Sequence, residues 1–169
     1  MSAGYQKLIQ GPVWLLKQIL VVAFALLVLD VLWGVASRYL LGHQSRWTEE
    51  LALFLLIWVS MLGAAVVYEE KAHLGVDYFV GKLDVDAQRW ASLMVDLIVM
   101  VFSLLVLVYG GWVLVVETLK AGQVSTALGI PMGYVYMAVP ISGVFFVLFG
   151  LGHMGATLAA KAGEVDQKG

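Results

Sequence analysis

Residues 51–68 read LALFLLIWVSMLGAAVVY, a run without a single charged side chain. A surface helix of a soluble protein carries a polar face opposite its apolar one, and this run has none. A helix needs about 20 mainly apolar residues to cross the hydrocarbon core of a bilayer. The run is therefore long enough for one crossing and predicts a transmembrane helix.

Three comparable apolar blocks flank this run, and each carries at most one acid or one histidine. They cover residues 19–37 with Asp30, residues 90–116 with Asp96, and residues 130–160 with His153. Continuous runs of this length favour helices over the short alternating segments of a membrane barrel. We therefore predict an all-α integral membrane protein with four transmembrane helices in one domain, 1–169. The predicted spans are 17–41, 48–69, 87–118 and 131–160.

Composition supports lipid as the solvent of this chain. Hydrophobic residues make up 62% and charged residues 13%, whereas soluble domains carry about 25% charged residues. The absence of cysteine excludes disulfides and thiolate metal sites, and a net charge of -2 provides no basic field for nucleic acid. No phosphate-binding loop, HExxH motif or nucleophile–base arrangement is present, so we expect neither an enzyme nor a cofactor.

The lysines and arginines predict the orientation of the four spans. The side that holds both termini and the second loop carries seven basic residues, and the opposite side carries three. The positive-inside rule places the richer side in the cytoplasm. Both termini are therefore predicted to be cytoplasmic. The seven are Lys7, Lys17, Lys71, Lys82, Arg89, Lys161 and Lys168; the three are Arg38, Arg46 and Lys120.

The second loop contains apolar residues at helical spacing. Ala72, Val76, Phe79 and Leu83 recur on one face, which predicts a short amphipathic helix over about 72–83 in the membrane interface. The alternative is an irregular loop that dips these side chains into the headgroups. His73 and Asp77 are four residues apart. Two ligands are too few for a metal site, which favours a local hydrogen bond or a contact with another subunit.

Asp30 lies near the middle of the first predicted span, where a carboxylate is costly unless it is paired, protonated or hydrated. One interpretation is an ion or proton relay, and the other is a hydrogen bond to a neighbouring helix. The single acid favours the hydrogen bond. Arg38, eight residues later, can face the same polar seam.

The segment RWTEE, residues 46–50, opens the second span. Thr48 is a candidate N-cap, and the helix dipole favours glutamates in the first turn. Yet Trp47, Glu50 and Trp58 share one face with Phe54, and a stripe of aromatic rings and a carboxylate suits a protein partner as well as lipid.

The fourth span contains two prolines and a stripe of small residues. Pro131 is predicted to be its first residue, and Pro140 is predicted to kink it. Gly152, Ala156 and Ala160 form the stripe, which permits close helix contact. We find no internal repeat, which disfavours an inverted-repeat transporter built from this chain alone.

Several segments together resemble a known family. They are DVLWGVASRYLLG at 30–42, RWTEELALFLLIW at 46–58, LGAAVVYEEKAHLGVDY at 62–78 and GIPMGYVYMAVP at 129–140. In order and spacing they are similar to the small membrane subunit of tripartite ATP-independent periplasmic (TRAP) transporters, the DctQ/SiaQ-like family. The resemblance covers nearly the whole chain.

The resemblance implies a scaffold subunit of an ion-gradient-driven importer in the bacterial inner membrane. Its partners would be a large permease subunit, a separate chain that carries the substrate and sodium sites, and a periplasmic binding protein that delivers an organic acid such as a dicarboxylate or a sialic acid. Arg38, Trp47, Glu49 and Glu50 would lie on the periplasmic side, near the large subunit or the docking surface. His73 and Asp77 would lie on the cytoplasmic side.

Two other functions remain open on the residues alone. The chain could be a self-sufficient homo-oligomeric transporter or channel that uses Asp30 as its coupling acid, or it could anchor a redox enzyme in the membrane. A large permease and a secreted binding protein encoded alongside would favour the importer. A flavoprotein or iron–sulfur partner would favour the anchor.

Overall fold

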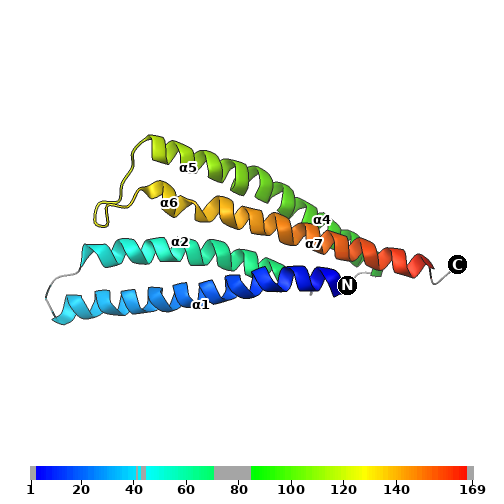
Figure 1. Cartoon of the computed structure of the whole chain (residues 1–169), viewed down its shortest axis with the longest axis horizontal. Helices are drawn as coiled ribbons and strands as arrows, with labels where there is room; N and C mark the ends of the chain where they lie inside the picture. The colour runs from blue at the N-terminus through cyan, green and yellow to red at the C-terminus, as the bar shows by residue number, and fades with distance from the viewer. Residues whose placement is uncertain (1–2, 41, 43–44, 71–84, 167–169) are drawn as a thin grey trace.

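The structure is a computed structural model that describes residues 3–40, 42, 45–70 and 85–166. Its regular elements in that part are helices, joined into four long helical segments (Figure 1). They are α1 (Ala3–Leu40), α2 (Arg46–Glu69), α4 (Val85–Phe102) with the π-helix η1 (Ser103–Gly110) and α5 (Gly111–Lys120), and α6 (Met132–Tyr136) with α7 (Ala138–Asp166). The predicted interfacial helix over 72–83 lies outside the described residues, as do His73 and Asp77.

The four segments lie side by side in one row (Figure 1). The order across the row is α1, α2, the α6–α7 segment and the α4–η1–α5 segment. The start of α1 and the end of α7 lie at the same end of the row (Figure 1), which we call the terminal end. The opposite end, with the α1–α2 and α5–α6 connections, is the connector end.

Each segment contains a stretch that is long and apolar enough to cross a bilayer. These stretches are Gly11–Leu40, Arg46–Glu69, Trp90–Lys120 and Met132–Gly155. In α1, at one edge of the row, only 6% of the most apolar window is buried within the chain, against 44% in the fourth stretch. Large apolar side chains therefore cover the outside of the row, as lipid requires. The predicted all-α protein with four spans is confirmed, although α1 begins before residue 17.

A regular seam joins α1 to the rest of the row. One set of buried and half-buried positions of α1 recurs at alternating steps of three and four residues, the spacing that keeps one face of a helix against its neighbour. Asp30 stands in this seam, so its carboxylate is turned inward. The seam consists of Val13, Leu16, Leu20, Ala23, Leu27, Asp30, Gly34 and Ser37.

Glycines bring the last two segments of the row into close contact. A Cβ atom on Gly143 of α7 would lie 2.7 Å from the Cβ atom of Leu107 in η1, and one on Gly111 would lie 3.0 Å from the Cδ atom of Pro140. Small residues in membrane helices permit such approach. These glycines are not the small-residue stripe predicted from the sequence, which consists of Gly152, Ala156 and Ala160. Its first member, Gly152, is buried, and the side chains of the other two are outside the described part.

The two prolines of the fourth segment lie at the start of its helix and near a break within it. The helix begins at Met132, one residue later than predicted, with Pro131 in the preceding cap position. A break at Met137 separates α6 from α7, and Pro140 stands in the first turn of α7. Because proline has no backbone N–H, Pro140 cannot donate to the carbonyl of Tyr136. The helix therefore lacks this one hydrogen bond, and the kink at Pro140 stays a prediction.

Candidate functional site

Glu50 is the most heavily hydrogen-bonded side chain in the described part. Its carboxylate accepts hydrogen bonds from the backbone N–H groups of Thr126, Ala127 and Leu128, each at 3.0 Å. The hydroxyls of Ser125 and Thr126 donate to it at 2.6 Å. Successive N–H groups that converge in this way form an anion-binding nest. Glu50 thus holds residues 125–128, which we call the capped loop.

The backbone of the α5–α6 connection presents those N–H groups. Gly122 and Gly129 adopt positive φ values of 63° and 67°, a conformation that other residues rarely take. A bridge between Val124 and Pro131 closes the connection, and Ser125 donates its N–H to the carbonyl of Ile130 at 2.9 Å. The capped loop is therefore a compact turn whose free N–H groups face α2.

This contact changes the interpretation of residues 46–50. Glu50 links the start of α2 to the connection between α5 and α6, and that internal function was missed at the sequence level. The available signal was the pair of glycines that flank Ser125 and Thr126. The N-cap prediction for Thr48 was wrong. Ser45 takes the cap position, and the Thr48 hydroxyl donates back to the Ser45 carbonyl at 2.7 Å.

Asp30 lines a pocket of about 270 Å³ between α1 and α2 at the connector end. Its residue surface is only 8% exposed, and neither carboxylate oxygen has a hydrogen-bond partner among the described residues. Arg38, Thr48 and Glu49 also line the pocket. The interhelical hydrogen bond favoured from the sequence is therefore absent from the described part. Arg38 lines the same pocket as Asp30 but is exposed and lies outside the seam.

The two tryptophans of the predicted partner stripe have different environments. Trp47 is 42% exposed at the start of α2. Trp58 is half-buried and packs against the buried cluster of Leu16, Leu62 and Val66, between α1 and α2. With Glu50 engaged by the capped loop, Trp47 is the member of this stripe that most resembles a free contact surface.

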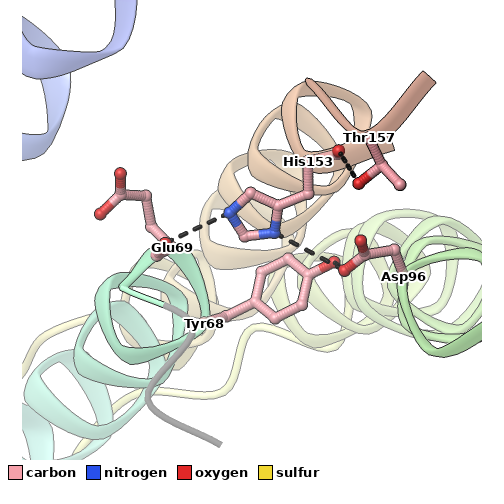
Figure 2. Close-up of polar contacts among 5 residues, drawn as sticks. All are labelled: Tyr68, Glu69, Asp96, His153 and Thr157. Carbon is pink, nitrogen blue, oxygen red and sulfur yellow. Dashed lines mark hydrogen bonds and ion pairs between the residues drawn. The ribbon is translucent and has the colours of Figure 1, made fainter. Parts of the chain in front are cut away.

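A second polar cluster joins three helices near the terminal end (Figure 2). The Tyr68 hydroxyl donates to the Asp96 carboxylate at 2.9 Å, and the His153 Nδ1 atom lies 3.6 Å from the same oxygen. The His153 Nε2 atom lies 3.2 Å from the carbonyl oxygen of Glu69, and the Thr157 hydroxyl donates to the His153 carbonyl at 3.0 Å. Tyr68, Asp96 and His153 are all buried.

This cluster has the character of a structural fastener. It joins α2, α4 and α7 at one depth, and the Asp96 carboxylate already accepts a hydrogen bond from Tyr68. The sequence contained the signal, because the three residues come from block ends that the topology brings to one side. The Lys17–Glu70 ion pair, at 2.6 Å and about half exposed, also links α1 to the residue that follows α2.

The polar contacts of the described residues hold helices and loops of the chain together. Among the described residues, no group of three or more histidines and acids is placed to hold a metal ion. The two ends of the row are instead fastened differently, by the capped loop at one end and the buried cluster at the other.

Comparisons with known proteins relate the chain to one class of transporter. The model of the DctQ component of tripartite ATP-independent periplasmic transporters matches residues 27–159. The sialic acid TRAP transporter small permease protein SiaQ of Vibrio cholerae is 27% identical over 164 residues, which cover 90% of this chain and 91% of SiaQ.

Two further relatives differ in length. The C4-dicarboxylate TRAP transporter small permease protein DctQ of Rhodobacter capsulatus is 27% identical over 131 residues, 74% of this chain and 57% of that protein. The isethionate TRAP transporter permease protein DctMQ of Oleidesulfovibrio alaskensis is 31% identical over 96 residues, 57% of this chain and 15% of that protein. A segment similar to this chain is therefore a small part of a longer permease in that organism.

Proposed function

Because the chain belongs to the DctQ component family of tripartite ATP-independent periplasmic transporters, we propose that it is the scaffold of an importer driven by an ion gradient. As a small TRAP subunit it is a multi-pass protein of the bacterial inner membrane and not an enzyme. In the proposal it pairs with a large permease subunit, a separate chain, and helps a periplasmic binding protein to dock.

The row of four helices supports the scaffold role. A transporter that works alone needs two parts that move against each other around a central site. Here the segments stand in line, and glycine contacts, the capped loop and the buried cluster fasten them to one another. A fastened row with broad apolar faces suits a fixed wall that widens the rigid part of a larger assembly.

The proposed orientation places both termini in the cytoplasm. The terminal end then faces the cytoplasm, and the connector end, with Arg38, Trp47, Glu49 and the capped loop, faces the periplasm. The exposed Trp47, together with Arg38 and Glu49, becomes the candidate surface for the large subunit or the docked binding protein. His73 and Asp77 belong to the cytoplasmic side in this orientation.

The proposed substrate class is a small organic acid. The relatives are named for sialic acid, C4-dicarboxylates and isethionate, which are all organic anions at neutral pH. The choice among such anions is expected in the large subunit and the binding protein, together with the sodium sites. We expect this chain to hold no cofactor of its own.

Purification of the tagged chain from its native membrane in mild detergent tests this function. A large polytopic permease recovered in about equal amount is the expected result. Liposomes with both chains and the binding protein should then take up an organic acid along a sodium gradient, and liposomes with this chain alone should not. Uptake by this chain alone, abolished in Asp30→Asn, would overturn the scaffold and support the homo-oligomeric transporter.

A further inference from the structure

The Asp30 pocket contains a charge that the described chain leaves uncompensated. Both Asp30 carboxylate oxygens are buried without a hydrogen-bond partner, yet an unpaired carboxylate within a membrane span is costly. The neighbouring Thr48 hydroxyl is turned away, because it donates to the Ser45 carbonyl. The described residues therefore hold the Asp30 carboxylate in place without supplying a hydrogen-bond donor for it.

The charges around the pocket indicate the sign of the missing group. Two acids, Asp30 and Glu49, and one base, Arg38, line it. The formal sum is one negative charge, so a single cationic group would neutralise the pocket.

The size and depth of the pocket distinguish the possible cations. A volume of about 270 Å³ is far greater than the roughly 30 Å³ that one water molecule occupies in the liquid, so a bare ion would leave most of it unfilled. Asp30 lies ten residues before Leu40, the end of α1, or about 15 Å along the helix axis. That distance is about half the thickness of the hydrocarbon core, too deep for a lipid headgroup.

We propose that this pocket receives one basic side chain, an arginine by its geometry, from a membrane helix of another chain. The two free oxygens of one carboxylate match the paired N–H groups of a guanidinium. The long apolar stem of arginine can fill the passage between α1 and α2. Under the proposed function, on which this assignment rests, the donor is the large permease subunit.

The first test compares the chain alone with its assembly. Asp30→Asn removes a charge that the isolated chain leaves unpaired, so its thermal unfolding temperature should stay unchanged or rise. In the assembly, the same change leaves the partner's base without its acid. Loss of one member of a buried charge pair typically weakens association by about thirtyfold or more, so recovery of the large subunit should fall accordingly. A stable variant that still recovers the full amount would refute the pairing.

The second test finds the occupant directly and does not depend on folding of the Asp30 variant. The chain has no cysteine, so Ala52→Cys places a single thiol in the pocket wall. A benzophenone maleimide on that thiol is photolysed in native membranes, and the adduct is sequenced. The expected adduct is a membrane-helix peptide of another chain, with an arginine or lysine within one turn of the crosslink. Leu105→Cys, on exposed η1 at the opposite edge of the row, is the control and should not label that peptide.

The outcomes separate the two proposals. An adduct with lipid, with this chain only, or with a peptide that lacks a base would overturn the pocket assignment while the wild-type assembly still supports the scaffold. A basic peptide from a second copy of this chain would overturn the large subunit as donor. Wild-type purification without any large subunit would overturn the scaffold itself, whatever the crosslink identifies.

Discussion

Gly143 is the position at which one added methyl group should separate two helices. In Gly143→Ala the new Cβ atom would lie 2.7 Å from the Leu107 Cβ atom and 3.1 Å from the backbone nitrogen of Val108. Ordinary carbon contacts are about 3.5–4.0 Å, so the overlap is about 1 Å. Neither neighbouring atom can rotate away, because both belong to the backbone or are fixed directly to it. The α7 and η1 segments must therefore move apart.

The expected magnitude combines two opposing terms. Overpacking of a filled interior costs about 1–3 kcal/mol, and replacement of glycine by alanine in a helix returns at most about 1 kcal/mol. The net loss lies between about 0 and 3 kcal/mol, and we expect the middle of that range, about 1–2 kcal/mol. In a chain of this size each kcal/mol changes Tm by about 2–4 °C. Gly143→Ala should therefore unfold about 2–8 °C below the wild type.

Gly155 provides a matched control in the same helix, α7. A Cβ atom at Gly155 meets no atom within 4 Å, so Gly155→Ala should leave Tm unchanged or raise it by a few degrees. Both variants can be followed by circular dichroism of the purified chain in one mild detergent. A Tm for Gly143→Ala equal to or above that of Gly155→Ala would show that the close approach of α7 to η1 is not needed.

Two further predictions concern the polar contacts. Glu50→Gln places an amide donor where the capped loop already presents donors, so the backbone amides of the capped loop should exchange hydrogen faster, as measured by mass spectrometry. Glu49→Gln, at the adjacent exposed position, should leave that exchange unchanged. Equal effects of the two variants would argue against the Glu50 anchor. Tyr68→Phe removes the hydroxyl that donates to buried Asp96 and should lower stability by about 1–3 kcal/mol. Tyr109→Phe, at a position 71% exposed, should change the stability little. If Tyr68→Phe also left the stability unchanged, another group would have to donate a hydrogen bond to Asp96.

The membrane architecture could be predicted because it depends on composition along the chain. Lipid offers the backbone no hydrogen bonds, so a long apolar run has to satisfy its own as a helix. That local requirement applies to residues 51–68 regardless of their neighbours. Pro131 and Pro140 were informative for a related local reason, since proline removes one backbone N–H donor from the helix, although Pro12 lies inside the continuous helix α1.

The polar contacts were harder to predict because their partners are distant in the sequence. Glu50 and the loop that it caps are more than seventy residues apart, and the residues alone were equally compatible with an exposed partner surface. Asp30 shows the converse. The sequence marked it as costly and favoured a hydrogen bond to a neighbouring helix, whereas the fold leaves it in a pocket without a partner in the described chain.

The sequence by itself determined the number of membrane spans, their membrane solvent and the family resemblance, because each of these depends on residue type and local order. Only the tertiary structure decided that the helices form a row, that Gly143 lies against η1, and which acids are satisfied. Helix packing and hydrogen bonds depend on distances between atoms brought together by folding, and a difference of about 1 Å separates a close contact from a clash.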